Sequence, residues 1–269
     1  MNKRSRIFLF IISLYVIVTP VVHGSNYEVN TNAQSFILEK LKTHDIVFLG
    51  TTHRKPVILR FLIELIPTLH KTGITHIGLE IASDQQTKID NFIQTGKKLT
   101  NIRIHPLIDC PEYRNLLTKL YTLNPNTRPK VIALDLPKFK NRKERNRDKW
   151  MARLIAKCFR KNTKAKMLVV VGNLHVLKVL NWQDNIPNQH KSTYGYIKDM
   201  KPDSRIFSIS QIIDENPKEC DFTDVFSHFD GSVVINCDRR FDGWKFGLTS
   251  IAAIKPTATC DLIDGIIVY

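Results

Sequence analysis

The stretch from Asp45 to His53, DIVFLGTTH, has a counterpart in the stretch from Met167 to His175, MLVVVGNLH. Each consists of a short apolar run followed by Gly-x-x-His. Such a run, ending at a glycine, is typical of a strand that is buried on both faces of a parallel sheet. The glycine allows a tight turn, and the histidine then follows at the end of the strand. The two stretches therefore predict two buried strands that each deliver a histidine to one edge of a sheet.

Strands and helices alternate around these two stretches. Further apolar runs at 75–81 and 131–135 predict strands, and Pro56 and Gly73 are placed to begin and end the first helix of the series. Alternating strands and helices imply right-handed crossovers and a mainly parallel sheet. We therefore expect an α/β fold, with one domain over residues 25–269 and helices flanking the sheet.

The C-terminal third is expected to be an irregular extension of the same domain. Residues 183–203 are polar and typical of a loop. Three more strands are expected further on, at 205–210, 232–236 and 263–269.

The N-terminus has the pattern of a signal peptide over residues 1–24. Basic residues at positions 3, 4 and 6 precede an apolar segment over residues 7–22, and Gly24 is a small residue suited to cleavage. The alternative is an uncleaved membrane anchor, but Pro20 and the short apolar run disfavour it. The mature protein is therefore expected to be exported, either to a periplasm or as a secreted protein.

The chain carries a formal net charge of +15 and five cysteines. The positive charge favours peripheral contact with anionic surfaces. No nucleic-acid-binding motif accompanies it, so a nucleic acid is not an expected partner. None of the cysteines forms a Cys-x-x-Cys pair, and their odd number leaves at least one unpaired in a monomer.

Chemically active side chains follow several of the expected strands. His53 and His175 follow the two quoted strands, three residues after Gly50 and Gly172 respectively. Glu80 lies at the end of a third strand. A fourth strand ends at Asp135 in the same way. In a parallel sheet these ends lie at the edge where ligands bind.

His53, Glu80 and His175 form the predicted site. They suit a divalent transition metal such as zinc or manganese, and they equally suit metal-free acid–base catalysis. The alternative is two unrelated histidines, each satisfied by backbone groups. Two Gly-x-x-His turns together with a carboxylate at a strand end favour the site.

The order of these motifs resembles a known superfamily. Gly78-Leu-Glu80, the pair Arg147-Asp148 before Met151-Ala152, and the turn from Val171 to Val176 are similar to motifs of ChaN-like haem-uptake proteins. The same superfamily includes the Tiki proteases, the TraB proteins and the erythromycin esterases. The resemblance covers about residues 45–180. Thr51 departs from it, because ChaN-like proteins and erythromycin esterases usually have Glu after the first glycine.

The resemblance implies three activities. Tiki relatives are metal-dependent proteases, erythromycin-esterase relatives hydrolyse esters, and ChaN-like relatives bind haem. We expect a metal-assisted hydrolase of peptidase or esterase type, acting on a small molecule or a peptide. His53, Glu80 and His175 would be metal ligands or acid–base groups, and Arg147 is a candidate for binding an anionic group.

Two other functions are carried as alternatives. Haem binding needs an axial ligand and an apolar slot, and no residue here matches the family's ligand position. Available tyrosines are Tyr113, Tyr194 and Tyr196. A non-catalytic protein that binds anionic surfaces through the basic stretch 138–166 is the other alternative.

Overall fold

The computed structural model describes residues 29–30, 32–137, 146–180, 191–212, 233–237 and 259–269. The predicted signal peptide, residues 1–24, lies outside these residues. Of the helices in the described ranges, none has both the length and the apolar character that crossing a membrane requires.

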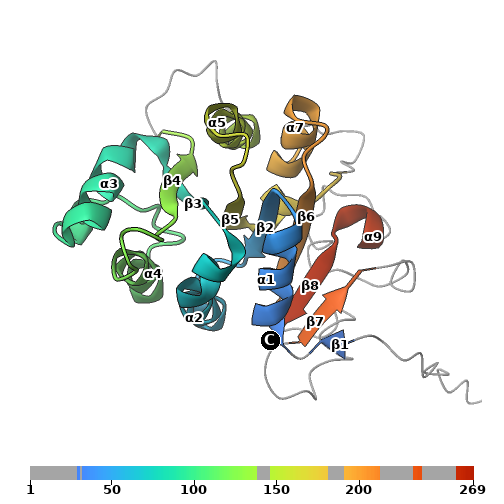
Figure 1. Cartoon of the computed structure of the whole chain (residues 1–269), viewed down its shortest axis with the longest axis horizontal. Helices are drawn as coiled ribbons and strands as arrows, with labels where there is room; N and C mark the ends of the chain where they lie inside the picture. The colour runs from blue at the N-terminus through green and yellow to red at the C-terminus, as the bar shows by residue number, and fades with distance from the viewer. Residues whose placement is uncertain (1–28, 31, 138–145, 181–190, 213–232, 238–258) are drawn as a thin grey trace, which may run out of the picture.

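All the described strands belong to one sheet, in the order β1-β7-β8-β6-β2-β5-β3-β4 (Figure 1). The six strands from β8 to β4 are parallel, whereas β7 runs antiparallel to both of its neighbours. The predicted α/β fold with a mainly parallel sheet is therefore confirmed. The strands are β1 (Val29–Asn30), β2 (Ile46–Thr51), β3 (His76–Ala82), β4 (Lys130–Asp135), β5 (Met167–Gly172), β6 (Ile206–Ile212), β7 (Val233–Asn236) and β8 (Gly265–Val268).

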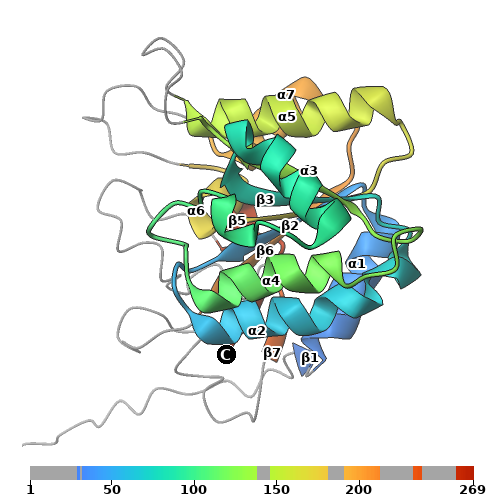
Figure 2. The ribbon, with the colours of Figure 1, turned by 90° about the vertical axis from the view of Figure 1, so that its left-hand side faces the viewer.

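Helices cover both faces of this sheet. Helices α1, α2 and α4 lie on one face, and α5 and α7 lie on the other (Figures 1 and 2). The α-helices are α1 (Ala33–Thr43), α2 (Pro56–Leu65), α3 (Gln86–Thr95), α4 (Pro111–Tyr121), α5 (Arg147–Lys161), α6 (Asn173–Val176), α7 (Thr193–Met200) and α9 (Thr259–Leu262). Three 3₁₀ segments complete the described helices: η1 (Ile66–Thr72), η2 (Ser83–Gln85) and η3 (Leu99–Asn101).

The double covering explains why the central strands are apolar at every position. In β2, Val47 and Leu49 join the core under α1, α2 and α4, whereas Ile46 and Phe48 join the core under α5 and α7. Successive side chains in a strand point to opposite faces, so a strand buried on both faces alternates between two cores. The continuous apolar run in the sequence reflects this geometry.

Local structure differs from the sequence predictions at two places. The helix that begins at Pro56 changes to 3₁₀ geometry at Ile66, next to Pro67, which has no N–H to donate. Gly73 still ends it in the left-handed conformation, with φ of 71°. Asp84, in the 3₁₀ turn η2 before α3, pairs with Arg103, with 2.6 Å from Asp84 Oδ2 to Arg103 Nη2.

The second difference lies in the segment 183–203, which was expected to be a loop. Helix α7 occupies Thr193–Met200, and Ser192 caps it by accepting a hydrogen bond from Gly195 N at 3.1 Å. Residues 181–190 lie outside the described part of the chain. The three strands expected near the C-terminus are present as β6, β7 and β8 in the same sheet.

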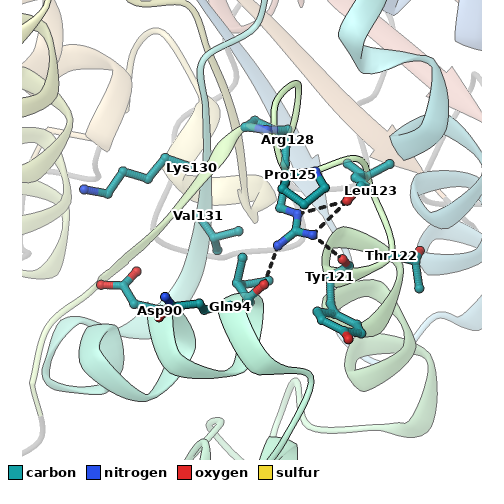
Figure 3. A pocket seen from close by; sticks show the side chains of 11 residues that line it. Asp90, Gln94, Tyr121, Thr122, Leu123, Pro125, Arg128, Lys130 and Val131 are labelled. Atoms are coloured by element: carbon teal, nitrogen blue, oxygen red, sulfur yellow. Dashed lines mark hydrogen bonds between the residues drawn. The ribbon is translucent and has the colours of Figure 1, made fainter.

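A hollow of about 820 Å³ lies between the ends of α3 and α4 and the start of β4 (Figure 3). Its wall includes Arg128, which donates hydrogen bonds to the carbonyls of Ile93, Tyr121 and Leu123. The cation thus satisfies carbonyls at the C-terminal ends of two helices, where a positive charge is stabilising. This hollow lies at the opposite end of β4 from Asp135. Its arginine, Arg128, stabilises the ends of the two helices.

Candidate functional site

Four neighbouring parallel strands carry the predicted site residues at their carboxyl ends. In the sheet these strands follow one another as β2, β5, β3 and β4. His53 follows β2, His175 lies in α6 directly after β5, Glu80 is in β3, and Asp135 is the last residue of β4. Strand β2 is followed by α2 on one face of the sheet, whereas β5 is followed by the short α6, and α7 lies on the other face (Figure 1). A divergence of this kind opens a crevice at the sheet edge, where α/β proteins bind ligands.

The backbone of Gly172 is the point on which the three predicted residues converge. A Cβ atom placed on Gly172 would lie 3.5 Å from Glu80 Oε2, 3.5 Å from His53 Cε1 and 3.6 Å from His175 Cδ2. Residues separated by more than 120 positions in the sequence therefore surround one backbone position. The structure brings His53, Glu80 and His175 together, as the strand ends predicted.

The reason for the two glycines differs from the expected one. We expected them to allow tight turns, yet in the described residues only Gly73 and Gly96 are glycines with positive φ. Gly50 is required for steric reasons, because a Cβ atom there would lie 2.2 Å from Asn173 Oδ1. Gly172 has φ of −57°, which any residue adopts, and a Cβ there would make ordinary contacts.

Glu80 is the most buried charge of the site, with 7% of its side chain exposed. Its Oε2 accepts a hydrogen bond from Gly172 N at 2.7 Å, and its Oε1 accepts one from Arg147 Nη2 at 2.7 Å. Burial alone would raise the pKa of Glu80, but the positive charges of His175 and Arg147 and the Gly172 N–H lower it. Glu80 is therefore ionised at neutral pH.

Arg147, which was expected to bind an anionic group, bridges two carboxylates of the protein. Its Nε donates to Asp135 Oδ1 at 2.8 Å, and its Nη2 donates to Asp135 Oδ2 at 3.0 Å as well as to Glu80. Burial would lower the pKa of Arg147, but the hydrogen bonds and charges of Asp135 and Glu80 raise it. The guanidinium thus joins the ends of β3 and β4 and orients Glu80.

His175 has an orienting partner to which the sequence analysis gave no role. Its Nδ1 donates to Asp148 Oδ1 at 2.8 Å, and the Thr193 hydroxyl donates to the same oxygen at 2.8 Å. Burial would lower the pKa of His175, but the hydrogen bond and charge of Asp148 raise it. Asp148 in turn has its pKa lowered, because the His175 and Thr193 hydrogen bonds outweigh its burial. In the sequence, the feature that could have pointed to Asp148 is the Arg147-Asp148 pair at the start of α5.

A buried network of hydrogen bonds holds the turns at Gly50 and at Asn173 in place. Gln211 Nε2 donates to the carbonyl of Gly50 at 2.8 Å, and Asn173 Nδ2 donates to the carbonyl of Gln211 at 2.9 Å. The Tyr269 hydroxyl donates to Gln211 Oε1. The C-terminal strands β6 and β8 thus support the turn that carries His53, a role that the sequence did not indicate.

The arrangement does not fit the expected metal site. Among the described residues, no group of three or more His, Cys, Asp or Glu side chains is placed to hold a metal ion. The Arg147 guanidinium lies 2.7 Å from Glu80 Oε1, and its positive charge opposes a cation there. His175 Nε2 is 3.9 Å from Glu80 Oε1, and the bond from its Nδ1 to Asp148 is compatible with acid–base catalysis as well as with metal ligation. The geometry suits acid–base chemistry better than metal ligation.

A cavity of about 20 Å³ adjoins the site, with His53, Glu80 and Tyr113 among its lining residues. This volume holds about one water molecule, so a porphyrin does not enter it. The other two tyrosines considered for haem do not line this cavity. Tyr196 Oη accepts from Asn146 Nδ2 at 2.7 Å, and the ring of Tyr194 packs against Phe48.

Comparison with known proteins places this geometry on a known fold. No family model and no curated protein matches the sequence. A variant of the erythromycin esterase EreC in its open conformation has a TM-score of 0.61 at 10% identity, over 87% of this chain and 92% of that one. A succinoglycan biosynthesis protein has a TM-score of 0.55 at 12% identity, over 86% and 89%. ChaN of Campylobacter jejuni with cofacial haem has a TM-score of 0.46 at 15% identity, over 68% and 87%. The chain therefore has an erythromycin-esterase-like fold, which confirms the predicted resemblance at the level of the fold.

The His175–Asp148 pair predicts a window of pH in which it stabilises the fold. The raised pKa of His175 adds stability that is present below 6.5 and is lost as the pH rises through the raised value. The lowered pKa of Asp148 adds stability that is present above 3.8 and is lost as the pH falls through the lowered value. The pair therefore contributes most between these limits.

Asp148→Asn should lower the free energy of unfolding by about 2 kcal/mol near pH 6 and by less near pH 9. Urea unfolding at both pH values measures this difference. A loss of equal size at the two pH values would contradict the charged pair.

The two glycines predict opposite outcomes for the same substitution. Gly172→Ala should leave the melting temperature nearly unchanged, because the added methyl group makes only ordinary contacts. Gly50→Ala should lower the free energy of unfolding by about 1–3 kcal/mol, because it overlaps Asn173. Thermal unfolding of both variants tests this, and equal stability of the two would refute the steric account of Gly50.

Proposed function

We propose that the protein is a metal-free hydrolase that cleaves esters or related carbonyl compounds by acid–base catalysis. The observation that carries the proposal is the convergence of His53, Glu80 and His175 around Gly172 at the carboxyl edge of the sheet. Two histidines in different environments supply both halves of a proton transfer, since one can accept a proton while the other donates one.

The environments of the two histidines support different roles for them. His53 is exposed at the end of β2, where a substrate and a water molecule can reach its ring. It would accept a proton from water as the water oxygen bonds to the carbonyl carbon. His175 is nearly buried and is held by Asp148, so its imidazolium would donate a proton to the leaving alkoxide. Glu80 stabilises that imidazolium through its negative charge.

The fold is compatible with this proposal. Erythromycin esterase EreC, whose fold the chain shares, is by its name an ester hydrolase. We retain export as part of the proposal, on the basis of the signal-like residues 1–24.

The basic surface considered for anionic partners is separate from the chemistry. The exposed basic residues of α5 include Lys149, Arg153, Lys157, Arg160 and Lys161. They lie along the outer side of a helix whose apolar side packs on the sheet. A solvated helix surface accounts for them, and hydrolysis remains the one function that the site geometry favours.

His53→Ala should lower kcat/KM for a p-nitrophenyl ester by about 10²-fold or more, because the proton acceptor is lost. The melting temperature should stay within a few degrees of the wild-type value, since His53 is exposed. His70→Ala is the matched control, because His70 is an exposed histidine in η1 and reports the background reactivity of surface imidazoles.

Gly172→Ala is an independent test of the site. Its methyl group would lie between the three side chains without disturbing the fold, so turnover should fall while the protein stays folded. Assays with and without EDTA, over a panel of esters and peptides, complete the test. Equal turnover by wild type, His53→Ala and Gly172→Ala would overturn the proposed site. Loss of turnover with EDTA would overturn its metal-free character.

A further inference from the structure

Tyr113 is a buried side chain that the fold leaves without a hydrogen-bond partner. It lies in α4, and only 5% of the residue is exposed. Among the described residues, its hydroxyl is the buried side-chain polar atom for which the protein supplies no donor or acceptor. Buried polar groups are nearly always hydrogen-bonded, because an unmet one costs about 1–3 kcal/mol. The Tyr113 hydroxyl therefore needs a hydrogen-bond partner that is not a protein atom.

Tyr113 also lines the cavity beside His53 and Glu80. The polar residues of this wall include Tyr113, Glu80 and His53, and apolar residues such as Leu59 and Ile108 close the rest. The volume of about 20 Å³ exceeds the roughly 10–15 Å³ that one water molecule requires. The cavity thus has room for one small polar molecule next to the ring of His53.

Charge and hydrogen-bond capacity identify that molecule. Each oxygen of Glu80 accepts one hydrogen bond and has a lone pair left, so a further partner must be a donor. Burial and the negative charges of Glu80 and Asp135 raise the pKa of Tyr113, so its hydroxyl stays protonated and can donate. A molecule that contacts both groups would accept from Tyr113 and donate to Glu80. Water does both, whereas an anion or a carbonyl oxygen cannot donate to Glu80.

We propose that Tyr113 and Glu80 hold one water molecule in this cavity, and that this water is the nucleophile of the hydrolysis. The inference rests on the proposed function and assigns Tyr113 a catalytic role in it. The water oxygen forms a bond to the carbonyl carbon, and one water proton passes to His53. The bond from that carbon to the leaving oxygen breaks, and the leaving oxygen takes a proton from His175. The products are a carboxylic acid and an alcohol.

Tyr113→Phe tests this role, because it removes the hydroxyl and keeps the ring. The crystal structure of the wild-type protein should show one water within hydrogen-bond distance of Tyr113 Oη, and that of Tyr113→Phe should lack it. With a p-nitrophenyl ester, kcat should fall by about 10²-fold. The melting temperature should not fall, since the removed hydroxyl bonds no protein atom. Tyr121→Phe, at the other end of α4, is the matched control and should behave as wild type.

The outcomes separate this inference from the proposed function. A wild-type cavity without water, or a Tyr113→Phe enzyme with unchanged kcat, overturns the inference even if His53→Ala is inactive. A lower kcat that comes with a lower melting temperature assigns Tyr113 a structural role and also overturns it. If wild type and His53→Ala are equally inactive on every ester, the proposed function fails. An ordered water bound to Tyr113 would then be structural, and its role as nucleophile would be refuted.

Discussion

The ionised carboxylate of Glu80 is the group on which the arrangement of the site depends. It is almost buried, so it must be compensated by nearby donors and cations. Arg147 and Gly172 N supply the hydrogen bonds, and the Arg147 guanidinium ties Glu80 to Asp135 at the end of the next strand. One carboxylate therefore connects the ends of β3, β4 and β5 with the start of α5. The neighbouring residue, Asp148, is thereby placed to orient His175.

This constraint links the fold to the chemistry. A parallel sheet covered on both faces brings the carboxyl ends of β2, β5, β3 and β4 side by side, and the chain departs from them toward opposite faces. This edge of the sheet carries an exposed histidine, a histidine held by a carboxylate, and a cavity with room for one water. In the proposed hydrolysis, these would serve as the base, the acid and the place of the attacking water.

Much of the fold and part of the site could be predicted from the sequence, because buried parallel strands leave a continuous apolar signal. The Gly-x-x-His turns and the strand-end position of Glu80 followed from that signal. The pairing of His175 with Asp148 could not be derived, because it depends on how α5 docks across the sheet. The same holds for Gln211 and Tyr269, whose contacts with the Gly50 turn arise from the packing of β6 and β8. The expected metal site stays a prediction, and the sequence does not reveal that the Arg147 guanidinium binds the Glu80 carboxylate.

A double-mutant cycle between Glu80→Gln and Arg147→Met tests the central claim most directly. The quantity measured is the free energy of unfolding of the wild type, both single variants and the double variant at neutral pH. If the Glu80–Arg147 pair organises the site, the double variant should lose less stability than the two single losses combined, by about 1–2 kcal/mol or more. Losses that add within about 0.5 kcal/mol would show that the two groups act independently, and would contradict the account.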